Sequence, residues 1–346
     1  MKILVTGGAG FIGSNFIRLL LASRPNFSII NYDNLTYAGN LANLTSVANN
    51  PNYQFIKDDI TNEPSVTAAI RSCDVVVHFA AESHVDRSIY DPATSIRTNV
   101  LGTQVLLEAA RKANLPRFLH ISTDEVYGDI PTPLTANEAD PLQPSSPYSA
   151  SKAAADLLLH SYARTYEFPA IVVRSSNNYG PNQFPEKFLP LIIANALENK
   201  PIPIYGDGTQ QRDWVHVEDH CRAILAALEN GKIGEIYNVG AGNFTDNLSL
   251  ARRVLQLMNK PESLISHVQD RPGHDRRYAV NFSKIETQLG WRPRISLEEG
   301  LCQTIDWYTK NPEWLDGVQS RDYLTYYEKY YVNRESSLQQ LSRPRE

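Results

Sequence analysis

The sequence lacks a cysteine framework, a long hydrophobic run and internal repeats. Its three cysteines, Cys73, Cys221 and Cys302, stand far apart and are odd in number. This pattern is typical of a reducing compartment, and it offers neither a disulfide framework nor the spacing of metal ligands. The apolar run in MKILVTGG is too short for the core of a signal peptide, and no stretch is long enough to span a bilayer. We therefore predict a cytoplasmic protein with no membrane segment and no metal site.

The sequence also lacks a strong excess of charge of either sign. Its 346 residues carry a formal net charge of -5, and acids and bases are mixed along the chain. This balance argues against nucleic acid or an anionic membrane as the main partner. The length is sufficient to bury a large core and predicts two domains, or one domain with an added lobe.

Short apolar segments alternate with helical segments over the first half of the chain. The predicted strands cover residues 2–6, 28–33, 53–56, 75–79, 117–122 and 170–174, and the main predicted helices cover 11–23, 91–113 and 148–166. Strands that are apolar throughout and alternate with helices indicate a parallel sheet covered on both faces. The predicted fold is therefore α/β, a doubly wound parallel sheet of the Rossmann type with a smaller C-terminal α/β lobe.

The pattern loosens beyond about residue 180, where proline-rich loops and shorter elements appear. We predict a nucleotide-binding domain with the catalytic residues over 1–180. A mainly substrate-binding lobe over 181–332 should follow, with some segments returning to the first domain. Residues 333–346 are polar and predict a flexible tail. The tyrosine-rich run 323–331 is more typical of a packing surface than of a binding stripe.

The first chemical motif is GGAGFIG, residues 7–13, which joins the first strand directly to the first helix. Gly7, Gly10 and Gly13 allow a tight turn and a close approach to a pyrophosphate that faces the helix N-terminus. A plain strand–helix turn is the alternative for the glycines alone. However, Asp33 ends the second strand, where a carboxylate can hold both hydroxyls of an adenosine ribose. No arginine follows it, which favours NAD over NADP.

Further cofactor contacts are expected from the segments around these strand ends. Asp58, Asp59 and Ile60 follow the third strand, where contact with the adenine edge and a solvated loop are both open. Ser83 follows the fourth strand and should lie near the nicotinamide and the substrate, and Thr98 precedes the long helix that starts near Asn99. The full set adds Phe11, Ile12, Asn34, Leu35, Thr36, Phe79, Ala80, Ala81 and Asn178.

The second motif is YSASK, which places Tyr148 and Lys152 one helical turn apart on the same face. A free tyrosine has a pKa near ~10 and is a poor base at neutrality. A neighbouring ammonium and a positive nicotinamide ring would favour the phenolate. The pair can then accept a hydroxyl proton while a hydride leaves the carbinol carbon, although the spacing alone also occurs by chance.

The TGGAGFIG and YSASK segments resemble the short-chain dehydrogenase/reductase superfamily, in its longer branch that modifies sugar nucleotides. The resemblance covers roughly residues 1–330. It narrows to the nucleotide-diphosphoglucose 4,6-dehydratases, above all those acting on dTDP-glucose, through YDNLTYAGN, AAESHVDRSI, STDEVYGD, SSNNYGPNQFPEKFLP, PIYGDGTQQRDWVHVEDH and DRPGHDRRY. It implies bound NAD, Tyr148 as the catalytic base, Lys152 on the nicotinamide ribose and Thr123 in the hydroxyl network.

Two adjacent acids, Asp124 and Glu125, distinguish a dehydratase from an epimerase. An epimerase only oxidises and reduces sugar C4, whereas a 4,6-dehydratase must also take the C5 proton and protonate the C6 hydroxyl. The resemblance implies that Glu125 is the C5 base and Asp124 the C6 acid. Neighbours on a strand point to opposite faces, so we predict that the strand stops at about Thr123 and the chain turns there. Helix capping by the acids is the alternative.

The resemblance also implies a site for the sugar nucleotide. Arginine suits a pyrophosphate because its fork bonds bidentately, although any one of these basic residues could equally be a solvated surface charge. His84, His120 and His274 do not have metal-ligand spacing. The expected substrate residues are Ser83, Thr123, Asn177, Glu186, Lys187, Phe188, Pro203, Tyr205, Arg212, Asn247, Arg271 and His274.

Several functions remain open at this point. dTDP-glucose is the favoured substrate, and UDP-glucose is the close alternative because the Thr-Asp-Glu run serves the reaction and not the base. An epimerase or decarboxylase is disfavoured by the two acids. A non-catalytic NAD sensor would have no need of Tyr148, Lys152 and Thr123. Because the family usually pairs two long helices from each subunit, here 91–113 and 148–166, we also predict a homodimer.

Overall fold

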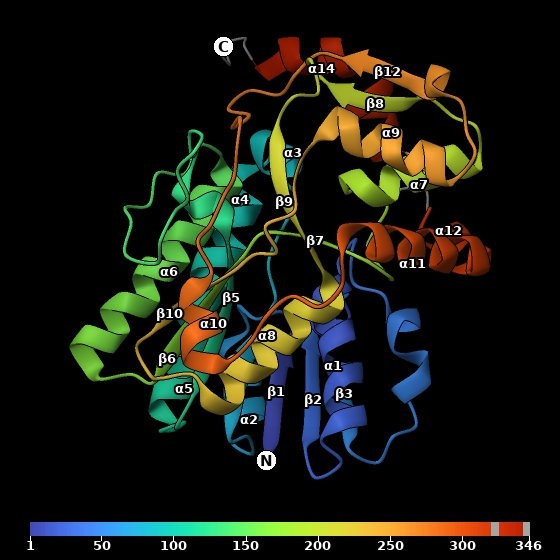
Figure 1. Cartoon of the computed structure of the whole chain (residues 1–346). Coiled ribbons are helices and arrows are strands. Elements are labelled where there is room, and N and C mark those ends of the chain that lie inside the picture. Colours follow the sequence, from blue (N-terminus) through green and yellow to red (C-terminus); the bar gives the residue numbers. More distant parts are fainter. Residues whose placement is uncertain (320–324, 342–346) are drawn as a thin grey trace.

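The computed structural model describes residues 1–319 and 325–341. Its centre is a parallel sheet of seven strands in the order β10-β6-β5-β4-β1-β2-β3, which confirms the predicted Rossmann fold (Figure 1). The strands are β1 (Lys2–Thr6), β2 (Ser28–Asp33), β3 (Tyr53–Lys57), β4 (Val75–His78), β5 (Phe118–Thr123), β6 (Ala170–Ser175) and β10 (Ile236–Val239).

Alternate residues of each strand face opposite layers of helices, as the pleat requires. Ile3 and Val5 of β1 belong to one core, and Leu4 belongs to the other. The first core is covered by α1 (Phe11–Ser23) and α8 (Val217–Asn230), and the second by α2 (Glu63–Ile70), α5 (Thr103–Lys112) and α6 (Pro147–Tyr166). Both faces are therefore covered by helices, which explains why the strands are mainly apolar.

The helical segment predicted over residues 91–113 is not one regular helix. It consists of α4 (Pro92–Ile96), a π-helical turn (Arg97–Gly102) and α5. The turn carries Asn99, whose side-chain amide donates to the Glu82 carbonyl at 3.0 Å and to Ser151 Oγ at 2.8 Å. It thereby joins the loop after β4 to α6, and π-helical turns often occur at functional sites.

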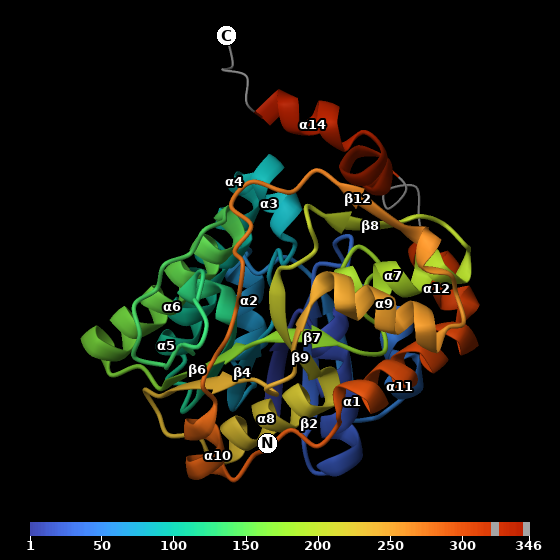
Figure 2. The same ribbon diagram turned by 45° about the horizontal axis from the view of Figure 1, so that its top comes forward.

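The second part of the chain forms a lobe above the carboxyl end of the sheet (Figures 1 and 2). Its strands are β7 (Asn177–Tyr179), β8 (Ile202–Tyr205), β9 (Gln211–His216), β11 (Phe244–Asp246) and β12 (Ile265–Val268). Its helices α7 (Phe188–Leu197), α9 (Asn247–Leu257), α11 (Leu297–Lys310) and α12 (Pro312–Val318) enclose a third core. Two later segments lie in the first part: β10 joins the main sheet, and α8 packs on it.

The remaining elements are short. They include α3 (Val85–Tyr90), α10 (Ser283–Leu289), the 3₁₀ turns Leu41–Val47, Asp124–Tyr127 and Glu262–Leu264, and a π-helical turn Glu328–Val332. The flexible tail predicted from residue 333 is wrong for α14 (Arg334–Leu341). This segment is ordered by contacts that are distant in sequence, since buried Arg334 donates to the Gln269 carbonyl at 2.6 Å. Residues 342–346 lie outside the described part.

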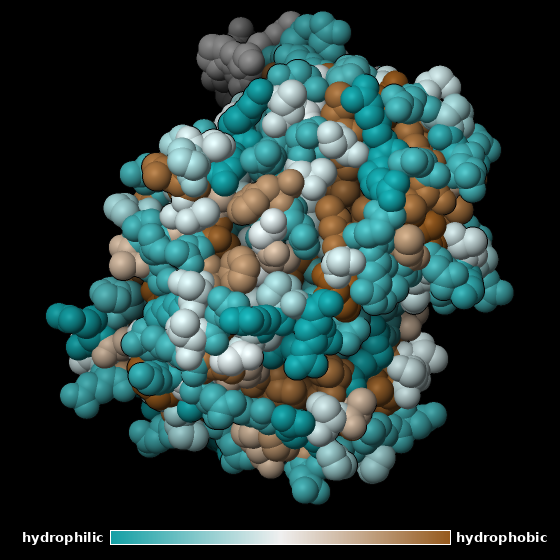
Figure 3. Space-filling view, viewed as in Figure 1, coloured by the Kyte–Doolittle hydropathy of each residue, from teal (hydrophilic) through white to brown (hydrophobic). Residues whose placement is uncertain are grey.

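The tyrosine-rich run is only partly described, and Tyr323 lies outside it. Tyr326 and Tyr330 are buried, with ring centroids 4.3 Å apart, in line with the predicted packing surface. In the described ranges, no helix has the length and hydropathy to cross a bilayer. On the face shown in Figure 3, the surface is mostly hydrophilic, with hydrophobic residues gathering in its middle.

Candidate active site

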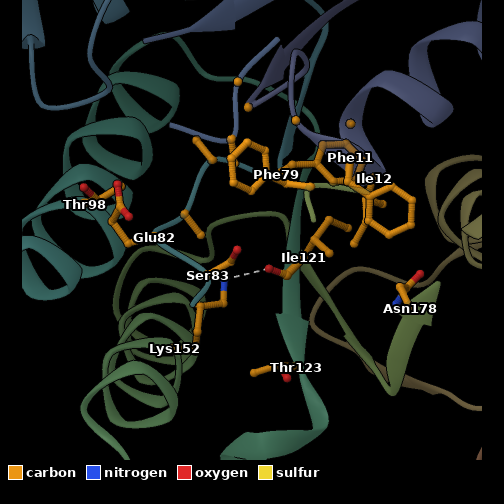
Figure 4. A pocket seen from close by; sticks show the side chains of 18 of the residues that line it. Phe11, Ile12, Phe79, Glu82, Ser83, Thr98, Ile121, Thr123, Lys152 and Asn178 are labelled. Carbon is orange, nitrogen blue, oxygen red and sulfur yellow. Dashed lines mark hydrogen bonds between the residues drawn. The ribbon is translucent and has the colours of Figure 1, made fainter. Parts of the chain in front are cut away.

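A large cavity lies at the carboxyl edge of the sheet, where open α/β folds bind ligands. Its lining contains every predicted cofactor residue except Leu35, and all five predicted catalytic residues. Figure 4 shows Phe11, Ile12 and Phe79 at one end of this cavity and Thr123 at the other, with Lys152 between them. The glycine loop, the Asp33 region and the YSASK helix, which are distant in sequence, therefore face one space.

The glycine loop is packed too tightly for side chains at Gly7 and Gly13, two of the three glycines of the motif. Gly7 has a φ of +71°, and a Cβ there would lie 2.5 Å from the Ala80 nitrogen. A Cβ on Gly13 would lie 2.4 Å from the Gly7 carbonyl oxygen. At Gly10 the nearest atom would be 3.3 Å away, so this position leaves room on the cavity side. The loop thus brings backbone to the cavity and aims the N-terminus of α1 at it, as a pyrophosphate requires.

Asp33 is fixed by backbone donors on both of its oxygens. The amide of Ala9 donates to Oδ2 at 2.9 Å, and the amide of Leu35 donates to Oδ1 at 2.8 Å. Leu35 was expected to contact the cofactor, but it does not line the cavity. Its φ is +54°, and its backbone turns back to hold Asp33. Leu35 therefore holds Asp33 through its backbone and does not itself face the cavity.

The strand β5 ends at Thr123, as predicted, and a 3₁₀ turn begins at Asp124. Thr123 Oγ1 accepts a hydrogen bond from the Glu125 amide at 3.3 Å, so the threonine caps this turn and the acids do not. The capping alternative for the two acids is therefore wrong. Asp124 and Glu125 both line the first cavity, because the turn removes the strand alternation that would have separated them.

The two acids lie in different electrostatic surroundings. Burial, and then the charge of Glu125, raise the pKa of Asp124 well above its usual value. Burial also raises the pKa of Glu125, but Arg271, Arg212 and Lys187 oppose this effect. Of the two, Asp124 is the more readily protonated, which is the division that an acid and a base need.

Tyr148 and Lys152 lie on the first turns of α6, which starts from a capping box at Ser146. Burial, and then Glu125, raise the pKa of Tyr148, while a hydrogen bond from Thr123 lowers it. Burial lowers the pKa of Lys152 to about 8. Lys152 Nζ donates to the Ile121 carbonyl at 2.7 Å, as Figure 4 shows, and lies 3.2 Å from His120 Nε2.

A second cavity adjoins the first and extends into the lobe. Glu125, Asn177, Glu186 and Lys187 line both cavities. The other predicted substrate residues of the lobe line the second one, namely Phe188, Pro203, Tyr205, Arg212, Asn247, Arg271 and His274. Ser83 and Thr123 line the first cavity. The residues predicted to bind the substrate therefore line two adjoining cavities. Arg212 and Arg271 lie in the second cavity, beyond the two acids.

Sequence reasoning missed several lining residues. In the first cavity these are Tyr32, Ala38, Gly39, Glu82, Ile121, Ser122, Ser175, Ser176, Gln183, Phe184 and His220. In the second they are Val85, Asp86, Leu191, Trp214, Tyr278 and Tyr331. Glu82 and Tyr278 lie within the motifs that carry the family resemblance, so those motifs could have indicated them. Nothing in the local pattern around Tyr331 indicates contact with the lobe.

The donor set of the two cavities fits a polar ligand. Buried side-chain atoms on their walls without a hydrogen-bond partner in the described part of the chain include Ser122 Oγ, Asp124 Oδ2, Asn177 Oδ1, Gln183 Oε1, His220 Nε2, Trp214 Nε1 and Arg271 Nε. A buried polar atom without a partner costs free energy, so a ligand with matching groups would stabilise this site. The described residues include no cluster of three His, Cys, Asp or Glu that could hold a metal ion.

Comparison with known proteins gives consistent matches over most of the chain. A family model described as GDP-mannose 4,6 dehydratase matches residues 4–304. The dTDP-glucose 4,6-dehydratase of Streptomyces niveus is 47% identical, with 94% of this chain and 98% of the relative covered. The dTDP-glucose 4,6-dehydratase 1 of Escherichia coli K12 is 48% identical, with 97% and 100% covered.

Solved structures agree with these matches. The dTDP-glucose 4,6-dehydratase of Streptomyces venezuelae, solved with NAD bound, has a TM-score of 0.90 and 46% identity, and 92% of this chain and 100% of that chain are covered. The UDP-glucuronic acid 4-epimerase of Bacillus cereus, solved with its sugar nucleotide and NAD, has a TM-score of 0.85 and 33% identity, with 90% and 99% covered. The fold therefore serves both reactions, and the site residues must distinguish them.

Proposed function

This chain belongs to the family of nucleotide-sugar 4,6-dehydratases, and from that premise we propose that it converts dTDP-glucose to dTDP-4-keto-6-deoxyglucose and water with bound NAD. One observation supports this reaction above all. Asp124 and Glu125 share a turn at the end of β5, beside Tyr148, and their surroundings favour one protonated and one ionised carboxyl group. Oxidation at C4 alone would not require two such groups.

Residues of the first cavity fit NAD. Asp33 faces the position of the adenosine ribose, and its negative charge would repel a 2'-phosphate. Gly7, Gly10 and Gly13 leave room for the pyrophosphate, and Lys152 lies where it can hold the nicotinamide ribose. When bound, NAD supplies the acceptor for the hydride from sugar C4 and the donor of the same hydride to C6.

Tyr148 takes the proton of the C4 hydroxyl in the first step. Thr123, which bonds to the phenol, can also hold that hydroxyl. The ammonium of Lys152 stabilises the phenolate, because an opposite charge nearby favours the ionised form. Lys152 is held in place for this role by its bond to the Ile121 carbonyl.

Glu125 and Asp124 then carry out the elimination. A ketone at C4 acidifies the C5 proton, and Glu125 removes it as the ionised member of the pair. Asp124 gives its proton to the C6 hydroxyl, which leaves as water, since hydroxide is a poor leaving group. Each such transfer by a positioned group is typically worth about 10²- to 10⁴-fold in rate. After reduction at C6, Glu125 returns a proton to C5.

A direct assay tests the function and the base preference together. The protein is incubated separately with dTDP-, UDP-, CDP- and GDP-glucose, and the 4-keto-6-deoxy product is measured. Product from dTDP-glucose at the highest kcat/KM is the expected result. A preference for UDP-glucose would assign the alternative substrate, and a C4 epimer without loss of water would refute the dehydratase.

The arrangement of two helical segments also supports a homodimer. Ile96 and Leu101, at the end of α4 and in the following turn, are 55% and 49% exposed, and Leu157 on α6 is 59% exposed. These segments pack side by side, and exposed apolar side chains of this kind mark association surfaces. Leu157→Glu should yield a monomer in sedimentation, whereas Ile233→Glu, at an exposed isoleucine outside these helices, should not. A monomeric parent protein would contradict the proposal.

Two further proposals concern organisation and location. We propose that residues 1–180 mainly hold the cofactor and the catalytic residues, and that 181–332 mainly hold the sugar nucleotide, in keeping with the linings of the two cavities. We also propose a reducing, cytoplasmic location. The three cysteines support it, because all are free thiols and two of them are buried.

A further inference from the structure

Residues 34–40 form a strap along the wall of the first cavity, between β2 and the 3₁₀ turn Leu41–Val47. The residues of the strap that line this cavity are Asn34, Thr36, Ala38 and Gly39. Tyr37, at the centre of the strap, does not line the cavity. Its ring packs instead against that of Phe184, with the ring centroids 5.8 Å apart.

Both ends of the strap are held by hydrogen bonds to the cofactor-binding motifs. At one end the Leu35 amide donates to Asp33 Oδ1 at 2.8 Å. At the other end the Asn40 amide donates to the carbonyl of Ala9, in the glycine loop, at 3.0 Å. Because its ends are fixed in this way, the strap has most freedom to move at its centre, where Tyr37 lies.

Tyr37 contacts a cation from a distant segment. The guanidinium of Arg87, on α3, lies 3.8 Å from the centroid of the Tyr37 ring and 4.5 Å from that of the Tyr326 ring. Arg87 Nε and Nη2 both lie 2.9 Å from Oε2 of Glu186, whose side chain is 1% exposed. A buried acid therefore fixes Arg87 in the position from which it contacts both rings.

This contact links the strap to the rest of the molecule. An aromatic face attracts a cation through its quadrupole, and the attraction is stronger where water is excluded. The side chain of Arg87 is only 29% exposed, so most of it is removed from water. Movement of the strap away from the cavity would separate Tyr37 from Arg87 and lose this attraction.

We propose that the contact between Tyr37 and Arg87 holds the strap against the bound cofactor and controls the rate at which NAD leaves the protein. The inference rests on the proposed function for its purpose, since one cofactor must accept the hydride from C4 and return it to C6. Tyr37 and Arg87 are positioning residues. They act through the strap and take no part in the proton transfers.

The test measures the release of NAD from the holoenzyme. The protein is loaded with radiolabelled NAD, an excess of unlabelled NAD is added, and the label that remains on the protein is followed over time. Tyr37→Leu should release NAD about 5- to 30-fold faster than the parent, because leucine offers no ring to the cation. Tyr37→Phe should recover most of the retention, because it keeps the ring.

Phe244→Leu is the matched control. The ring of Phe244, on β11, lies 5.0 Å from the guanidinium of Arg277, and this residue lines neither of the two cavities. The control loses the same kind of contact away from the strap, so its rate of NAD release should be that of the parent.

Turnover gives a second readout, which a general loss of packing would not produce. In Tyr37→Leu, the formation of product should slow over successive turnovers as the cofactor is lost. Added NAD should restore it, with kcat within about twofold of the parent, because the groups that transfer protons are unchanged.

Melting temperatures identify any variant that does not fold. If Tyr37→Leu is unfolded, Arg87→Lys decides. Lysine can pair with Glu186 but has no planar fork to lie over the rings, so this variant should also release NAD faster. A folded Tyr37→Leu variant, or a folded Arg87→Lys variant in its place, that releases NAD at the parental rate would overturn the inference. If the parent retains NAD and Tyr37→Leu loses it, but neither converts dTDP-glucose, the proposed function is refuted and the inference stands.

Discussion

Replacing Glu125 by glutamine should separate the two halves of the reaction. Glutamine keeps the size and the ability to accept the 3.5 Å hydrogen bond from Tyr278, but it cannot take the C5 proton. Tyr148, Lys152 and Thr123 are unchanged, so oxidation at C4 should continue. The variant is therefore expected to stop after oxidation and before the elimination of water.

The surroundings of Glu125 indicate how the substitution should change the rates of C4 oxidation and of elimination. The charge of Glu125 is one cause of the raised pKa of Tyr148, so its removal should make proton transfer to Tyr148 no slower. Loss of the C5 base should lower kcat for product by about 10²- to 10⁴-fold. The same loss of charge removes one cause of the raised pKa of Asp124, although burial, the larger cause, remains.

Stopped-flow mixing with dTDP-glucose measures both halves. The near-ultraviolet absorbance of reduced nicotinamide should rise on the protein to about one equivalent per site, while 4-keto-6-deoxy product accumulates slowly. Glu63→Gln, at an exposed glutamate on α2, should behave like the parent. Product formation by Glu125→Gln at the parental rate would show that Glu125 is not the base. A loss of both phases would place Glu125 in the oxidation step instead.

Three further predictions test other parts of the site. Asp33→Ala should weaken the binding of NAD and relieve the repulsion of the NADP 2'-phosphate. If the ratio of the dissociation constants for NAD and NADP does not change, Asp33 does not hold the ribose. C4 oxidation should slow as pH rises through about 8, because Lys152 loses its proton there. Asp156→Asn should move this decrease in rate to lower pH, since Asp156 raises the pKa of Lys152. A pH profile of single-turnover oxidation that is the same in the variant and the parent would contradict this prediction. Substrate with deuterium at C4 should carry it to C6, and reaction in heavy water should label C5 only; loss of the C4 label to solvent would refute internal hydride transfer.

The parts of the site that could be predicted from the sequence are those in which local pattern and chemistry agree. β5 was recognised by its apolar run, and its end was placed near Thr123 because two acids on a strand cannot face one substrate. The glycine loop could likewise be predicted from the sequence, because neighbouring backbone atoms at Gly7 and Gly13 leave no room for a side chain. In both regions the local backbone conformation determines which residue types can be present.

The parts that were missed depend on contacts between distant segments. Leu35 adopts a left-handed backbone conformation, which is rare for leucine and has no signal in the sequence. This conformation turns its amide toward Asp33. Arg334 and Tyr331 lie in a polar, tyrosine-rich stretch whose order comes from Tyr205 and Gln269. Such tertiary contacts determine the structure of the segment more than its local composition does. From its sequence alone, the segment therefore resembles a loose tail.

The electrostatics of Tyr148 link proton transfer to occupation of the first cavity. Burial and the charge of Glu125 both raise the pKa of this phenol, so the protein alone keeps it protonated at neutral pH. Burial also lowers the pKa of the Lys152 ammonium to about 8, which limits the positive charge that it can supply as pH rises. A bound oxidised nicotinamide ring would add positive charge to this cavity and lower the pKa of the phenol, and reduction of the ring would remove that charge. Tyr148 would therefore take the C4 proton more readily while the cofactor is oxidised than after the hydride has been transferred.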